Sequence, residues 1–258
     1  MDPERPKTSL AAPSAAPLVV VVLAIVAGAA GGLWWFLGRS SPPPAATAQG
    51  AAVEEAPAPP AAAPVDPARQ RSLLQAVSTS PAWQRTVGEP ELARRWAVVV
   101  ENLANDVVPR KQLEPFAPAV RFSVVRRGTS TFVDPASYAR YDAFADLVAS
   151  VNVDALAIAW AAFRPAVEAA FRALGYPDGA VDAAAVRALR RVAAAPTREG
   201  ELAVVEGAGA TWAYADPELE RLGDVDKQLL RMGPRNARIL QEKAREILRA
   251  LAPGPADR

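Results

Sequence analysis

The sequence predicts a mainly α-helical protein with a single transmembrane helix near the N-terminus, followed by a compact helical domain with one or two small β-hairpins. Three observations support this fold class. Residues 18–37 form an uncharged apolar run, residues 38–66 are rich in proline and alanine, and residues 67–251 place apolar side chains at helical spacing between proline and glycine signals. The remaining segments, 1–17 and 252–258, are predicted to be short tails.

The apolar run from Leu18 to Leu37 is long enough to cross a lipid bilayer. Twenty residues of α-helix span about 30 Å, which matches the hydrocarbon thickness, and the run ends close to two tryptophans, whose indole rings favour the headgroup region. The run is also longer than the apolar part of a signal peptide. The sequence therefore favours an uncleaved single-pass anchor over a cleaved signal peptide.

The charges that flank this run predict its orientation. Arg5 and Lys7 precede it, and Arg39 alone follows closely. Positive charge is enriched on the cytoplasmic side, so we expect a cytoplasmic N-terminus, an inner-membrane location and a periplasmic or extracytoplasmic C-terminal domain. Gly28 and Gly32 lie four residues apart, a spacing that permits weak homodimerisation of membrane helices and is also common in any alanine-rich helix.

Residues 38–66 form the predicted disordered Pro/Ala linker. This segment has two glutamates and almost no large apolar side chain, so it has nothing with which to build a core. At about 3.1 Å per residue for an extended proline-rich chain, it could reach roughly 90 Å. We interpret it as a spacer rather than a docking motif.

The first part of the predicted domain contains two helices and a hairpin. Asp66 followed by Pro67 is typical of an N-cap and a first helical turn, and predicts a helix to about residue 78. A second helix is predicted over about 90–105, and alternating apolar residues before Gly128 predict a small hairpin. The apolar stripe of the second helix consists of Leu92, Trp96, Val99, Val100 and Leu103.

The middle of the domain contains two further predicted helices. Asp134 followed by Pro135 is again typical of a helix N-terminus and predicts a helix that begins there. A long helix is predicted over about 154–174, with a kink at Pro165 and a left-handed C-cap at Gly175. The predicted buried side of the helix after Asp134 consists of Tyr138, Tyr141, Phe144, Ala145 and Val148. That of the long helix consists of Leu156, Trp160, Phe163, Val167, Phe171 and Leu174.

The last part combines helices with a second predicted hairpin. We expect a helix over about 182–194, two short strands around Gly207 to Gly209, and a short helix that begins at Asp216 and Pro217. Two more helices are predicted, around 226–232 and over 234–251. The packing stripe of the last helix is Leu240, Ala244, Ile247, Leu248 and Leu251.

The composition excludes several chemistries. The chain has neither cysteine nor histidine, which removes thiolate nucleophiles, disulfides, histidine-dependent triads and imidazole metal sites. Lys+Arg 29 against Asp+Glu 28 gives no overall field that would attract nucleic acid, so we expect no nucleic-acid partner. No phosphate loop, dinucleotide fingerprint or metal-ligand cluster is present in the sequence, and we predict no cofactor and no metal.

Carboxylates are the remaining candidates for enzyme chemistry. Asp142 and Asp146 lie one helical turn apart beside an apolar stripe, and Glu168 flanks the stripe of the long helix. Paired carboxylates of this kind carry out glycoside hydrolysis, but a carboxylate beside an apolar stripe usually marks only the edge of the solvated face. We therefore assign no catalytic residue.

Four phrases in the domain carry a resemblance to a known family. They are SYARYDAF (137–144), FRALGYPDG (171–179), YADPELERL (214–222) and QLLRMGPRNARIL (228–240). In this order, over about residues 66–251, the chain resembles a bacterial family known as a domain of unknown function (DUF3014). The resemblance implies a single domain in a membrane-tethered envelope protein. It implies no activity and no catalytic residues.

These observations favour a non-catalytic binding or scaffold module in the cell envelope. One alternative is a carboxylate-dependent hydrolase or lyase that acts on envelope polysaccharide. Another is a domain that faces the cytoplasm and scaffolds an intracellular complex. For the binding module we expect an envelope protein as partner. The candidate partner-binding residues are Tyr138, Tyr141, Arg231, Arg235 and Arg238, the arginines lying in the basic C-terminal part of the chain, which could also be a solvated helix face.

Overall fold

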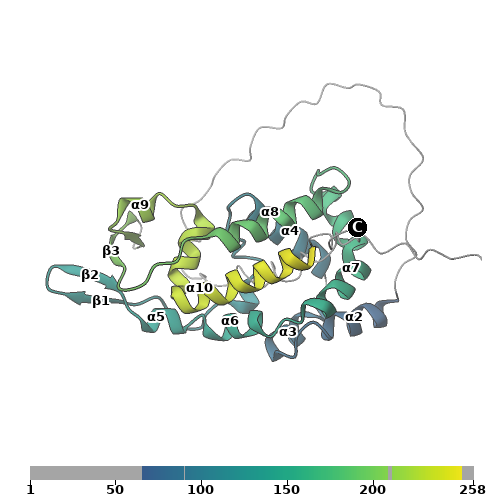
Figure 1. The fold of residues 1–258 in the computed structure, drawn as a ribbon, viewed down its shortest axis with the longest axis horizontal. Coiled ribbons are helices and arrows are strands. Elements are labelled where there is room, and N and C mark those ends of the chain that lie inside the picture. The colour runs from purple at the N-terminus through teal and green to yellow at the C-terminus, as the bar shows by residue number, and fades with distance from the viewer. Residues whose placement is uncertain (1–65, 90, 209–210, 252–258) are drawn as a thin grey trace, which may run out of the picture.

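The computed structural model describes residues 66–89, 91–208 and 211–251. Within them the protein is mainly helical with one small antiparallel sheet, as the sequence predicts. The predicted tails, the transmembrane helix 18–37 and the linker up to residue 65 lie outside the described residues. Figure 1 shows the helices gathered in one body and the strands at one end of it.

The first three described helices are α2 (Pro67–Gln75), α3 (Pro81–Thr86) and α4 (Leu92–Ala104). Asp66 caps α2 as predicted, since its carboxylate accepts hydrogen bonds from the N–H groups of Ala68 and Arg69. The sequence did not predict α3, which is too short to show helical periodicity. A tertiary contact holds it, because the buried Trp83 indole donates to the Leu74 carbonyl at 2.7 Å.

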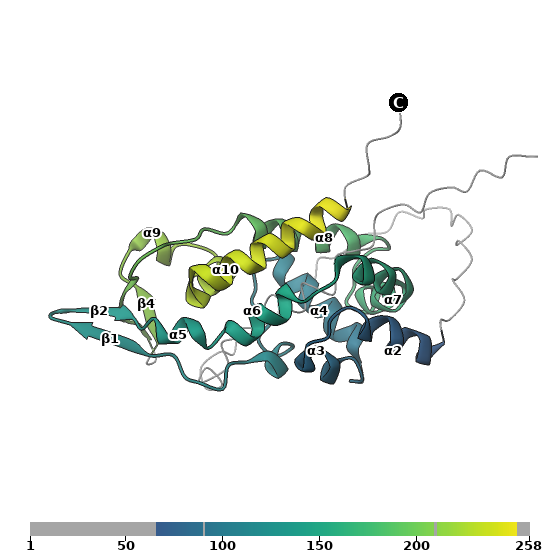
Figure 2. The same ribbon diagram turned by 60° about the horizontal axis from the view of Figure 1, so that its bottom comes forward.

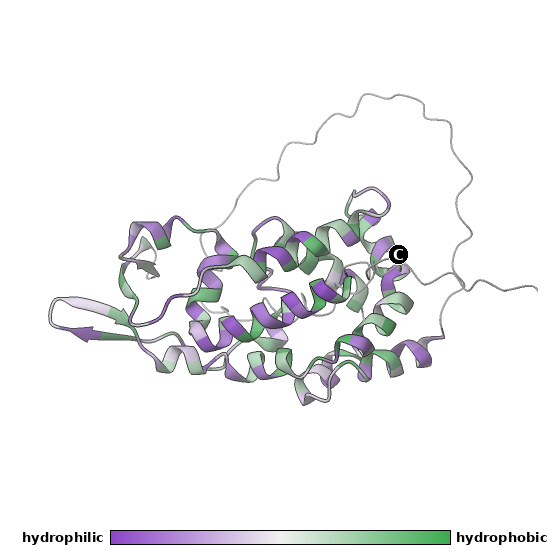
Figure 3. Cartoon of the chain, in the orientation of Figure 1, coloured by the Kyte–Doolittle hydropathy of each residue, from purple (hydrophilic) through white to green (hydrophobic). Residues whose placement is uncertain are grey.

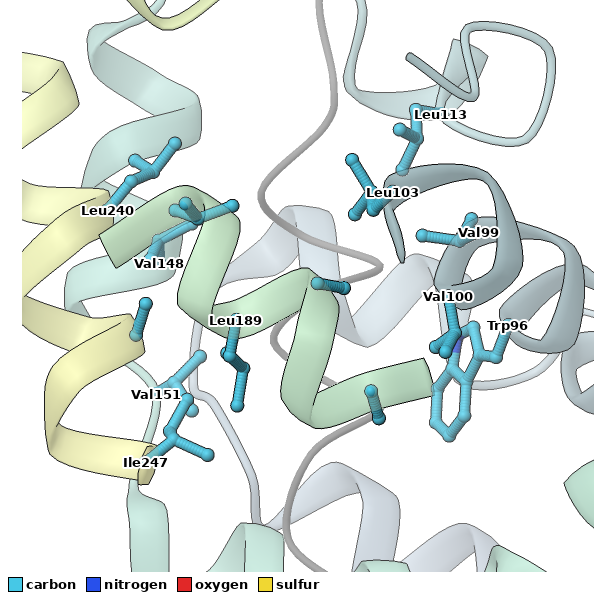
Figure 4. Close-up of a cluster of buried hydrophobic side chains, with 14 of the residues drawn as sticks. Trp96, Val99, Val100, Leu103, Leu113, Val148, Val151, Leu189, Leu240 and Ile247 are labelled. Atoms are coloured by element: carbon cyan, nitrogen blue, oxygen red, sulfur yellow. The ribbon is translucent and has the colours of Figure 1, made fainter. Parts of the chain in front are cut away.

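Three long helices complete the body: α7 (Val153–Ala173), α8 (Ala180–Ala194) and α10 (Asp224–Leu251). Figure 4 shows Leu189 of α8 among buried side chains from α4 and α10, which places α8 between those two helices. Trp96 stacks on Trp83 at 6.1 Å between ring centroids and meets Phe163 edge-on at 4.9 Å. Aromatic pairs of this kind join α3, α4 and α7 in one core.

Two predicted helices are divided in the structure. The helix after Asp134 consists of α5 (Ala136–Ala139) and α6 (Asp142–Ala149). Helix α10 contains a non-helical residue, Gly233, so its two segments correspond to the two helices predicted over 226–232 and 234–251. In Figure 3, hydrophilic and hydrophobic residues alternate in bands along α10, as expected for a helix with one buried face.

The two predicted hairpins are both present and form one sheet. They comprise β1 (Val124–Arg127) with β2 (Ser130–Val133), and β3 (Ala203–Glu206) with β4 (Trp212–Tyr214). Strand β2 also pairs antiparallel with β3, which gives the order β1-β2-β3-β4. The short helix η1 (Glu114–Phe116) precedes the sheet, and α9 (Pro217–Glu220) follows it.

The sheet has a small core of its own. Val133, Leu202, Val204, Tyr214, Leu219 and Leu230 are its buried members. Leu230 belongs to α10, and the half-buried Tyr138 of α5 packs against the same cluster. Helices α5 and α10 therefore connect the core of the sheet to the main helical core.

Among the described helices, none is by itself both long and apolar enough to cross a membrane. Helices α6 and α7 satisfy that test only as a pair, by length and composition, with a bend of 83° between them.

Candidate functional site

The most unusual backbone in α10 is the break at Gly233. Its φ of 80° and ψ of 162° lie in a region that side-chain-bearing residues essentially never adopt. The ring of Tyr138 lies directly against this glycine, and Pro234 then begins the second segment of α10, where the lack of an N–H costs no helical hydrogen bond. The sequence Gly-Pro thus sets the point at which the corner between α5 and α6 meets α10.

Asn236 holds this junction together. It is 1% exposed, and its Nδ2 donates to three oxygens: the carbonyls of Tyr138 and Met232, each at 3.0 Å, and Oδ1 of Asp142 at 2.9 Å. Its own Oδ1 accepts a hydrogen bond from Arg235 at 2.9 Å. Both functions of the amide are used, so the residue must be both donor and acceptor here.

Tyr141, a predicted partner-binding residue, lies inside this junction and has no exposed area. Its hydroxyl accepts hydrogen bonds from Arg140 Nη2 at 2.8 Å and from Gln228 Nε2 at 3.2 Å. The Arg140 guanidinium also lies over the Tyr141 ring, 4.7 Å from its centroid. In this structure Tyr141 connects the corner between α5 and α6 with α10, and its side chain is buried.

Tyr138 and Arg231 lie at the side of the junction that faces the sheet. Tyr138 is half-buried, and this burial raises the pKa of its phenol. The Arg231 guanidinium lies 5.9 Å from the ring centroid of Tyr214 and donates to the Trp212 carbonyl at 3.4 Å. Burial raises the pKa of Tyr214 strongly, although the nearby Arg231 acts in the opposite direction. Arg231 therefore links α10 to β4.

Arg235 and Arg238 are the two predicted residues that solvent reaches most freely. Arg235 forms ion pairs with Asp142 at 3.3 Å and with Asp146 at 3.1 Å, and Arg238 pairs with Glu199. The arginine side chains are 59% and 50% exposed. The outer side of α10 thus presents a row of arginines, each beside an exposed carboxylate.

The carboxylates considered for catalysis do not converge. Asp142 and Asp146 share the guanidinium of Arg235, whereas Glu168 lies on α7, where its Oε1 accepts a hydrogen bond from the Gly179 N–H at 2.6 Å. Glycosidase chemistry needs one acid in an apolar pocket and a second carboxylate facing it. Neither aspartate has such surroundings, and Glu168 supports the start of α8.

Three residues that the sequence did not single out help to hold α10 in place. Asn236 and Gln228 are buried polar residues in the phrase 228–240, and no periodicity distinguishes them from solvated helix positions. Asp106, with a φ of 63°, accepts a hydrogen bond from the Val225 N–H at 3.2 Å and pairs with Arg191 at 3.3 Å. It caps the first turn of α10 from the end of α4.

Three of the four family phrases meet at the break in α10. The phrase 137–144 forms α5 and the start of α6, the phrase 228–240 spans Gly233, and Tyr214 begins the third phrase. The remaining phrase, 171–179, lies at the turn between α7 and α8, where the Tyr176 hydroxyl donates to Glu101 at 2.7 Å. The residues behind the resemblance are therefore mostly those that join α5, α6, α10 and the sheet.

These features define a helical domain with an appended four-stranded sheet, held together by a buried polar junction. The model of the family described as "Protein of unknown function (DUF3014)" matches residues 92–248. The chain belongs to this family, which confirms the resemblance over a slightly shorter range than the sequence analysis assigned. No curated protein and no solved structure matches the chain.

Proposed function

We propose that this chain is a non-catalytic, single-pass membrane protein of the bacterial cell envelope, whose C-terminal domain binds a protein partner. The observation that carries the proposal is the row of exposed arginines on α10. Arg235 and Arg238, beside Arg231 and Tyr138, form the proposed partner face. Family membership is consistent with this proposal and adds no activity.

The ion pairs on this face suit exchange with a partner. Pairs between solvent-exposed side chains contribute only about 0–1 kcal/mol, so carboxylates of a partner can replace Asp146 or Glu199 at little cost. The backbone beneath them is held by Asn236 and Gly233, which keeps the arginines in place on a rigid element. A rigid, charged surface gives specificity and a rapid encounter with an oppositely charged partner.

The N-terminal part of the chain supplies the proposed location. The apolar run from Leu18 to Leu37 would anchor the protein in the inner membrane, with the domain on the periplasmic or extracytoplasmic side. The proline-rich linker would let the domain act at a distance of up to roughly 90 Å from the bilayer. Gly28 and Gly32 would permit a weak homodimer of the anchors.

Proximity cross-linking of the full chain in its own membrane tests this function. The reference is a chain that consists of the anchor and linker alone. The variant Arg235→Glu with Arg238→Glu reverses the charge of the proposed face. Arg69→Glu with Arg71→Glu makes the same charge change on the exposed side of α2.

The proposal predicts an envelope protein that the full chain and the α2 variant both recover, and that the α10 variant does not. If the α10 variant recovered as much of this envelope protein as the α2 variant does, the α10 face would be refuted as the binding surface. A reporter fused after Arg258 establishes on which side of the membrane the domain lies, and an active cytoplasmic reporter would refute the extracytoplasmic location.

A further inference from the structure

Strand β1 leaves one edge of the sheet open. The Val133 N–H donates to the Leu202 carbonyl at 2.9 Å, so Val133 directs its backbone groups toward β3 and not toward its β1 partner, Val124. Backbone groups alternate along an antiparallel strand, and therefore Val124 and Arg126 direct their N–H and C=O groups away from the sheet. Within the described residues, no backbone group bonds to these outward groups. Figures 1 and 2 show that this hairpin projects beyond the helices.

A row of apolar side chains lies on the face of the sheet opposite its core. The register places Val125 beside Phe132, Phe132 beside Ala203, and Val205 beside Ala213. These five residues share a face because side chains alternate along a strand, and none of them belongs to the buried cluster of the sheet or packs against it. Val205 is 50% exposed. A strand added next to β1 would extend this apolar row.

The charges on β1 determine what kind of strand it accepts. The Arg126 and Arg127 side chains are 74% and 58% exposed, and their pairs with Glu206 and Glu201 lie in solvent, where they are weak. The β1 strand of a second copy would add two more arginines at this edge, which disfavours self-pairing. An acidic strand would instead gain attraction at both positions.

We propose that the open edge of β1 binds an extended acidic segment of a protein partner, which pairs with it as a fifth strand. The complement of Val124-Val125-Arg126-Arg127 is a segment with two apolar residues next to two acidic residues. Backbone hydrogen bonds supply affinity in this mode, and side chains supply specificity. This inference rests on the proposed function in taking the domain as a binding module, but the surface is distinct from the α10 face.

Peptide binding to the full chain in detergent tests the inference. The probe is a fluorescein-labelled peptide, Glu-Glu-Val-Val-Glu-Glu, which offers the complementary order in both strand directions. One control peptide carries lysine in place of glutamate, and a second is the acidic peptide with N-methylated backbone. We expect saturable binding of the acidic peptide in fluorescence anisotropy, which weakens in high salt, and no binding of either control.

Variants of the edge locate the binding. Arg126→Gln removes the positive charge and keeps the outward backbone N–H. Arg126→Pro removes the positive charge and also the N–H. Proline is tolerated where the N–H of an edge strand faces solvent, so circular dichroism of Arg126→Pro should match that of the parent. We expect a fewfold weaker binding for Arg126→Gln and a loss of about tenfold or more for Arg126→Pro.

A charge-swapped variant distinguishes a loss of binding caused by the changed charge from one caused by misfolding. It combines Arg126→Glu and Arg127→Glu with Glu201→Arg and Glu206→Arg, which keeps both intramolecular pairs and reverses the charge of the edge. It should bind the lysine peptide and reject the acidic one. Binding of the lysine peptide by the parent, or unchanged acidic-peptide binding by Arg126→Pro, would overturn the inference.

The two proposals fail separately. Absence of acidic-peptide binding at millimolar concentration refutes the β1 edge, while the cross-linking result with the α10 variant stays interpretable. Conversely, peptide binding that depends on Arg126 supports the β1 edge even if charge reversal at Arg235 and Arg238 leaves partner recovery unchanged.

Discussion

Gly233 packs so closely against the ring of Tyr138 that a Cβ atom built on the glycine would stand 2.5 Å from Tyr138 Cγ. Both residues belong to phrases that identify the family, and they lie 95 positions apart in the chain. The contact sets the distance between α5 and α10, because a larger residue at either position would separate the two helices. It explains in steric terms why a glycine interrupts an otherwise continuous helix.

Gly233→Ala should destabilise the domain by about 3 kcal/mol or more. The cost combines the steric contact with a backbone conformation that alanine adopts only under strain. Urea unfolding followed by circular dichroism measures it. Gly88→Ala is the control, since a Cβ at Gly88 has nothing within 4 Å, and we expect a change within about 0.5 kcal/mol. Similar midpoints for both variants would contradict the proposed role of Gly233.

Asn236→Asp should cost about 3 kcal/mol or more at neutral pH, because it points a carboxylate at three oxygens that now accept hydrogen bonds. The matched control is Asn152→Asp. Asn152 uses its side-chain oxygen to accept from the Ala155 N–H at the start of α7, and aspartate serves equally well there. Thermal unfolding of the two variants should differ by several degrees, and equal losses would show that Asn236 is not acting as a donor.

The stability of the domain should fall at alkaline pH. Burial raises the pKa of Tyr214 and Tyr138 above the ordinary value of 10.0, and a hydrogen bond to Glu101 raises that of Tyr176. The unfolded chain then releases phenolic protons at a lower pH than the folded one does. The contribution of these three tyrosines to the free energy of unfolding is therefore fully present below about pH 10. It is lost as the pH rises toward their folded-state pKa values.

Tyr214→Phe isolates the largest of these contributions. Melting temperatures between pH 8 and pH 11 should decline less steeply for this variant than for the parent, because phenylalanine has no proton to release. Absorbance at 295 nm follows phenolate formation directly. Identical pH profiles for the two chains would contradict the buried, neutral state of Tyr214.

Asp106 provides a test of long-range capping. Asp106→Ala should cost about 2 kcal/mol, because it removes the acceptor for the Val225 N–H and the partner of Arg191 and leaves alanine at a positive φ. Asp106→Asn keeps an acceptor and tolerates that φ, so its cost should be smaller. Asp178→Ala breaks an exposed pair with Arg172 and should be nearly neutral. A loss for Asp178→Ala as large as that for Asp106→Ala would contradict this ranking.

The sequence was sufficient where the signal is local. Apolar spacing located α4, α7, α8 and α10, and the cap signals at Asp66 and Asp216 are both confirmed by hydrogen bonds. The helices predicted over 226–232 and 234–251 are separated at Gly233 in the structure. Each of these features depends on residues within a few turns of one another, which is the range over which periodicity and capping act.

Pairings between distant segments could not be predicted in this way. Both hairpins were expected, but their union through Thr131 and Val204 joins strands that α5, α6, α7 and α8 separate in the chain. Helix α3 depends on the contact of Trp83 with Leu74. Tyr141 is buried, as its helical spacing predicts, but the partner of its hydroxyl, Gln228, lies 87 residues further along the chain and could not be foreseen.

The sequence by itself determined the mainly helical class, most helices, both hairpins and the family. Only the tertiary structure decided which amide side chains are buried and which charges have partners, and so it placed Gln228 and Asn236 in the interior and left Arg126 and Arg127 at an open sheet edge. The physical reason is one of range. Helical periodicity and capping act between neighbours in the chain, whereas burial and ion pairing depend on residues that folding brings together from distant positions.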